Sequence, residues 1–89
     1  MLANPSGTPV NQTASGTVAK TGGRLLGFYV NSTTAGTIVI NEFDGATTTA
    51  VSGTITPAIG WHAFPASMAK GCSTTIGGTL NVTLFFAPA

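Results

Sequence analysis

The chain has 89 residues, of which only five carry a charged side chain: Lys20, Arg24, Glu42, Asp44 and Lys70. These make up 6% of the chain, against roughly 25% in an average soluble domain. Three cations without a basic cluster exclude nucleic acid as a partner, and no apolar stretch is long enough for a membrane span. The composition predicts one domain with a charge-poor surface that favours association with other protein.

The first part of the chain differs in composition from the rest. Residues 1–17 contain Pro5 and Pro9, many small polar side chains, and apolar residues without a period. Such a segment buries too little apolar surface to order itself alone. We therefore expect an extended N-terminal arm over 1–17, lying on a partner or adding a strand to a neighbour's sheet, and a β domain over 18–89.

From Val18 onward, short segments rich in Val, Ile, Thr and aromatic residues alternate with Gly and Pro. This pattern is typical of antiparallel strands joined by tight turns. The predicted strands are 24–31, 37–43, 47–55, 61–64, 72–76 and 79–86. Because the apolar face of a single sheet needs a second layer, we expect an all-β fold of six or seven short strands. It would be a small antiparallel β-sandwich or a jelly-roll-like barrel.

Local signals add detail to this prediction. Alternation places Leu26, Phe28 and Val30 on one face of their strand, and the same pattern recurs at Leu80, Val82 and Leu84. Asp44-Gly45 predicts a two-residue hairpin. Pro65 is expected to end a strand, and 66–70 to form a single helical turn.

The residues that carry chemistry are few and scattered. His62 is the single histidine, without a nucleophile linked to it by a motif, and we expect it on the outer face of its strand beside Trp61. Cys72 is the single cysteine and is interpreted as a small buried residue. Glu42 and Asp44 favour a turn over a weak metal site. The sequence thus predicts no enzyme, no cofactor and no metal centre.

Two further features bear on binding. Asn11, Asn31 and Asn81 each begin an Asn-x-Thr glycosylation sequence, but such matches arise by chance in a chain with many Thr residues. Trp61 follows Gly60 at a strand start, where core or intersubunit packing is favoured and contact with another protein is the alternative. Aromatic side chains on a β scaffold also leave open a sugar-binding platform.

Three segments carry a resemblance: GRLLGFYVNSTTAGTIVI at 23–40, ITPAIGWHAFPASMAKG at 55–71 and TIGGTLNVTLFF at 75–86. Together they resemble small β-sandwich virion proteins of tailed bacteriophages. The resemblance implies a non-enzymatic structural protein, a capsid decoration (cement) protein on the outer surface of the head. It also implies a homotrimer or another small oligomer bridging capsomers, with no catalytic residues to transfer.

We therefore expect a virion protein that binds the major capsid protein and associates with itself, with no nucleic-acid or membrane partner. The alternative is a receptor- or glycan-binding β module of a tail fibre or spike. Residues predicted to lie at an interface are Pro5, Pro9, Val10, Val18, Trp61 and His62.

Overall fold

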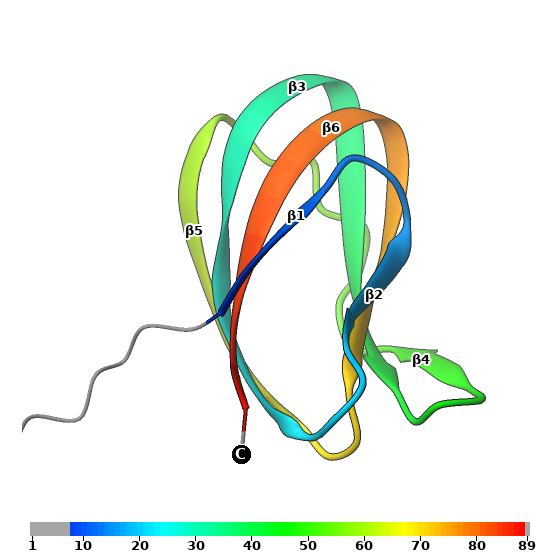
Figure 1. Cartoon of the computed structure of the whole chain (residues 1–89). Coiled ribbons are helices and arrows are strands. Elements are labelled where there is room, and N and C mark those ends of the chain that lie inside the picture. Colours follow the sequence, from blue (N-terminus) through cyan, green and yellow to red (C-terminus); the bar gives the residue numbers. More distant parts are fainter. Residues whose placement is uncertain (1–7, 89) are drawn as a thin grey trace, which may run out of the picture.

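A computed structural model describes residues 8–88 and shows an all-β protein, as the sequence predicts (Figure 1). Six strands form one antiparallel sheet. Their bounds are β1 Thr8–Gln12, β2 Gly16–Ala19, β3 Gly23–Phe43, β4 Thr48–Ala50, β5 Gly60–Met68 and β6 Cys72–Pro88. Within the described residues, no helix is long and apolar enough to cross a membrane.

Two long strands organise the fold. β3 and β6 pair antiparallel from Gly23↔Pro88 to Glu42↔Cys72, and both bend over the same end of the molecule (Figure 1). The segments 24–31 and 37–43 are therefore parts of one strand, and 72–76 and 79–86 are parts of another. The turns predicted between them are bends through which the pairing continues. Bending converts one sheet into two facing layers.

The connectivity of the two layers is that of a jelly roll. Layer 1 contains, in spatial order, β1, residues 82–88 of β6, residues 23–30 of β3, and β5. Layer 2 contains β2, residues 72–77 of β6, residues 37–43 of β3, and β4. Counted along the chain as eight segments, the layers run 1-8-3-6 and 2-7-4-5, the two-sheet arrangement of a jelly roll.

Small residues at the bends allow the two long strands to lie close together there. Gly78 has φ +65°, and a Cβ there would lie 2.4 Å from the carbonyl oxygen of Ala35. Ala35 itself has φ 52°. The neighbouring Gly36 is buried, and its N–H donates to Thr33 Oγ1 at 3.1 Å. Any side chain at Gly36 or Gly78 would push the two bends apart.

The core lies between the layers and agrees with most of the predicted alternation. Ile38, Ile40, Leu80, Val82 and Leu84 are all buried.

One predicted face is wrong. Leu25, rather than Leu26, joins Phe28 and Val30 in the core. The register between β3 and β6 shifts between Leu25 and Gly27, so that one residue of β3 is extra. A bulge of this kind shifts the alternation of side chains by one position.

The structure also corrects the N-terminal arm. From Thr8 onward the segment belongs to the sandwich, because β1 and β2 pair with the two halves of β6. Gln12 and Val18 are buried by this pairing. The predicted boundary between 17 and 18 thus falls inside β2, and residues 1–7 lie outside the described residues. β6 supplied the burial that the segment lacks by itself.

Three local predictions are wrong. Phe43 pairs with Thr48, so the hairpin loop spans residues 44–47 rather than two residues. The helical turn predicted at 66–70 is strand, because β5 continues to Met68. Pro65 lies between the paired residues Ala63 and Ala66 on an edge strand, where a missing N–H is tolerated.

Candidate functional site

A row of side chains crosses the outer face of layer 1. Trp61 pairs with Tyr29, Tyr29 with Thr83, and Thr83 with Asn11, so the row spans all four strands. Their neighbours along the strands, such as Val30 and Val82, are buried. Since side chains alternate between the faces of a sheet, the row points away from the core. We call these four residues, with the flanking Asn31 and Asn81, the aromatic–amide row.

The aromatic end of the row is held in place by packing. The indole of Trp61 lies over Gly27, where an added Cβ would come 2.7 Å from the ring. The ring also meets Phe85 edge-on, with centroids 5.6 Å apart. Trp61 and Tyr29 nevertheless remain 51% and 43% exposed. A fixed but exposed aromatic surface therefore occupies one end of the row.

The other end is a network of amides and a hydroxyl. The Nδ2 groups of Asn11 and Asn31 both donate to Asn81 Oδ1, at 2.8 and 3.2 Å. Both also donate to Thr83 Oγ1, at 3.3 and 3.0 Å. The three asparagines come from β1, β3 and β6, and the sequence analysis treated them as uninformative. Their shared Asn-x-Thr sequences were the one signal in the sequence, but only the fold places the three side chains together.

The predicted interface residues fall in different places. Trp61 and Pro9 lie on the outer face of layer 1, where Pro9 pairs with Phe85. Val18 is buried in the core, and the half-buried Val10 packs against the core. Pro5 lies outside the described residues. The structure thus keeps two of the predicted interface residues on an outer face.

His62 does not lie beside Trp61 on the outer face. Burial alternates along β5, and His62 is on the side facing the core, stacked on Phe28 with centroids 5.2 Å apart. Its Nε2 lies 2.8 Å from the carbonyl oxygen of Ala58, to which it donates. The imidazole therefore packs and anchors the loop before β5.

The outer face of layer 2 has a different character. A shallow hollow of about 260 Å³ is lined largely by hydroxyl and amide side chains. Asn41 Nδ2 donates to Thr75 Oγ1 at 3.1 Å across this surface. We call it the hydroxyl face; Thr17, Thr48 and Thr75 are its exposed members, and the buried Asn41 and Ser73 form its floor. It carries no charged side chain.

The charged side chains gather at the end opposite the bends. An added Cβ at Gly71 would lie within 2.7 Å of the carbonyl oxygens of both Ala19 and Phe43, so three connections meet there (Figure 1). Glu42 accepts a hydrogen bond from the Ala69 N–H at 2.7 Å. We call this the charged end; it comprises Lys20, Arg24, Glu42, Asp44 and Lys70.

Asp44 closes the loop at this end. The N–H groups of Thr47 and Ala46 donate to its Oδ1 at 2.6 and 2.9 Å. These hydrogen bonds hold the pKa of Asp44 below its usual value, and the charge of Lys70 acts in the same direction. The turn interpretation of Asp44 is confirmed.

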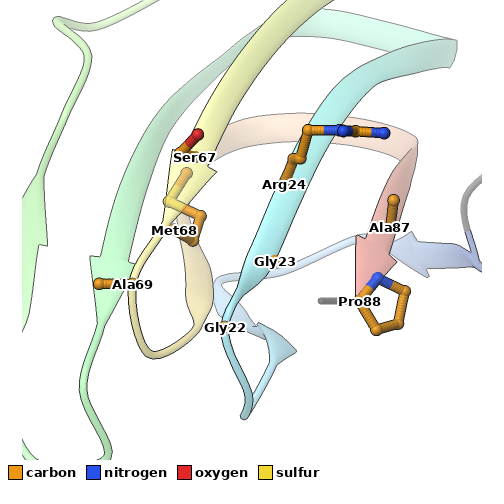
Figure 2. A pocket seen from close by; sticks show the side chains of 8 residues that line it. All are labelled: Gly22, Gly23, Arg24, Ser67, Met68, Ala69, Ala87 and Pro88. Atoms are coloured by element: carbon orange, nitrogen blue, oxygen red, sulfur yellow. The ribbon is translucent and has the colours of Figure 1, made fainter.

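An open hollow of about 410 Å³ lies beside the charged end (Figure 2). Arg24 is the one charged side chain that lines it, and the rest of its wall is formed by residues such as Gly22, Ser67 and Met68. Figure 2 shows the Arg24 side chain extending across β3, away from Gly22 and Gly23. One exposed cation among small residues makes a weak anion contact and supplies no acid–base pair.

Cys72 is buried in the core, and its burial raises the pKa of the thiol to about 11. Its interpretation as a small buried residue is confirmed. Within residues 8–88, no three His, Cys, Asp or Glu side chains come close enough to hold a metal ion.

Fold and surfaces together define a small jelly-roll domain with few charged side chains, which lie toward one end. No family model matches the chain, and neither the curated proteins nor the solved structures that were compared contain a match.

Proposed function

We propose that the chain is a non-enzymatic structural protein of a tailed-phage virion, a decoration protein on the outside of the head. It would bind the major capsid protein and associate with itself as a homotrimer. The supporting observation is the distribution of charge. All five charged side chains belong to the charged end, and none of them lines the hydroxyl face.

An uncharged face of small side chains suits a flat contact with other protein. Burying charge is costly unless every charge is paired, whereas Thr, Ser and Asn can hydrogen-bond with a partner or with trapped water. Many copies on one shell would add avidity, so each contact can be weak. The hydroxyl face is the surface that we assign to the capsid.

Occupancy on shells tests the proposal. We expect the purified chain to bind shells assembled from the major capsid protein of the same phage. Thr75→Glu would place a charge in the middle of the hydroxyl face and reduce occupancy at least about tenfold. Thr21→Glu, an equally exposed change beside the charged end, is the matched control and should bind normally. Equal occupancy of the two variants would remove the hydroxyl face from the proposal.

The N-terminal segment needs a shorter deletion than its predicted bounds suggest. Removing residues 2–16 would delete β1 and damage the fold, since β1 is part of layer 1. Removing residues 2–7 leaves every described strand intact. Loss of occupancy after this deletion would assign the first residues to capsid binding, and normal occupancy would exclude them.

A receptor- or glycan-binding module of a tail fibre or spike is the second candidate. The exposed aromatic–amide row favours it, because such a surface suits a ligand more than a flat capsid contact. Imaging of a tagged copy on virions separates the two. Density on the head supports a decoration protein, and density confined to the tail overturns it.

A further inference from the structure

We propose that the aromatic–amide row is a binding site for a neutral oligosaccharide. The row lies on the outer face of layer 1, across β5, β3, β6 and β1, which lie side by side in Figure 1. The proposal rests on the row itself and holds wherever on a virion the chain is located.

The first argument comes from the exposed aromatic rings. Four large hydrophobic side chains are exposed, and two of them, Tyr29 and Trp61, are direct cross-strand partners in the body of the sheet. Aromatic faces offer an apolar platform against which the C–H face of a pyranose ring can pack. Gly27 and Phe85 fix the indole of Trp61, so binding requires little further ordering of the ring.

The second argument comes from hydrogen-bonding groups left over in the amide network. Within the network, Asn11 and Asn31 donate through their Nδ2 groups. The acceptors are Asn81 Oδ1 and Thr83 Oγ1. Among the described residues, the Oδ1 atoms of Asn11 and Asn31 and the Nδ2 of Asn81 have no partner. Two acceptors and one donor thus remain for a ligand. Vicinal hydroxyl groups, which both donate and accept, match this set.

The third argument concerns charge and size. No charged side chain belongs to the row, and Arg24 lies five residues from Tyr29 along β3, which favours a neutral ligand over an acidic one. Three spacings between adjacent strands give the row a length of about 14 Å. That length suits a short oligosaccharide, whereas a protein partner would need roughly 800 Å² of surface. A second copy would also have to desolvate the unpaired amide groups.

Binding can be measured on the intact chain. We would screen the folded protein against an array of neutral gluco-, galacto-, manno- and N-acetylglucosamine-type oligosaccharides, with sialylated glycans included. The best neutral glycan would then be titrated while tryptophan emission is followed, because Trp61 is the sole tryptophan. We expect a saturable blue shift, and sialylation should not improve binding.

Variants locate the site. Asn31→Ala, which removes an exposed amide from the network, should weaken binding about tenfold while the indole reporter is retained. Tyr29→Ala should weaken it by a similar factor. Thr49→Ala, an exposed change on β4 in layer 2, should leave the affinity unchanged.

Three results would overturn the proposal. The first is that no neutral glycan on the array binds. The second is that Asn31→Ala and the parent chain bind with equal affinity. The third is that tryptophan emission shifts with protein concentration in the absence of sugar. The last result would show that the aromatic–amide row contacts a second copy of the chain instead of a sugar. None of them depends on shell occupancy, so this site and the decoration proposal can fail separately.

Discussion

The two outer faces of the sandwich differ although the same two strands build both of them. In layer 1, β3 and β6 present Tyr29 and Thr83 beside the exposed Trp61. In layer 2 the same strands contribute the exposed Thr75 and, beneath it, the buried Asn41 and Ser73, which are all short and polar. The bends separate the faces. A single strand pair can therefore carry a surface that suits a ligand at one half and a surface that suits flat protein contact at the other.

The bends that separate the faces give the largest expected effect. Gly78→Val would force a β-branched residue into φ +65° and direct its Cβ at the Ala35 carbonyl. We expect a loss of about 3 kcal/mol or more in the free energy of unfolding, measured by urea denaturation.

Gly53→Val is the control for this variant, since a Cβ at Gly53 meets nothing within 4 Å. It should change stability by less than about 1 kcal/mol. Equal losses of unfolding free energy in the two variants would show that the close approach of the two bends contributes no stability.

The next effect concerns Cys72, which lies behind the hydroxyl face. With its pKa raised from 9.0 to about 11, its thiolate fraction at pH 8 should be about a hundredfold lower than that of an unperturbed thiol. We expect slow alkylation by iodoacetamide in the folded protein and fast alkylation in urea. Ser67→Cys in a Cys72→Ala background supplies an exposed reference thiol. Rapid labelling of both folded proteins would contradict the burial of Cys72.

A smaller effect tests the polar contact inside the sandwich. Thr74 Oγ1 donates to Gln12 Oε1 in the interior, which ties β6 to the end of β1. Thr74→Val would leave a buried acceptor unpaired and should cost about 1–3 kcal/mol in the free energy of unfolding. Thr49→Val on the exposed strand β4 is the control. The double variant Gln12→Leu/Thr74→Val should recover part of the loss, and a further additive loss would argue against the contact.

The smallest effect is expected at the charged end. Because the folded pKa of Asp44 is lowered, its ionised form stabilises the fold above the unfolded value of about 3.9. That contribution is lost as the pH falls through the folded pKa. Asp44→Asn keeps an acceptor oxygen for Thr47 and Ala46 but removes the charge. Between pH 5 and pH 2, its Tm should fall less than that of the parent chain, and parallel Tm profiles would rule out this linkage.

Some of the structure could be read from local patterns. Alternation located the buried residues Ile38, Ile40, Leu80, Val82 and Leu84, because these segments are regular strands with one face toward the core. It failed at Leu25 and Leu26, where a bulge shifts the pattern. Pro65 failed as a strand end for a related reason, since its effect depends on whether the strand lies at an edge.

The candidate sites were less predictable than the core. The sequence marked Trp61 as a candidate interface residue because it is a single tryptophan after a glycine. The other members of its row, Tyr29, Thr83 and Asn11, come from three other strands. Nothing local in the sequence links Asn11 to Asn81, which lie 70 positions apart and share a hydrogen bond. The charged end was equally hidden, because its members are spread from Lys20 to Lys70.

The sequence by itself determined that this protein is built of β-strands, that its core is apolar and that its charges are few. These properties follow from side-chain shape and from alternation, which are local. Only the tertiary structure decided that residues 8–19 join the sheet, that two strands bend into a jelly roll, and that the asparagines meet beside Trp61. Such outcomes depend on pairing between distant segments, and the sequence of one strand does not specify which segment it pairs with.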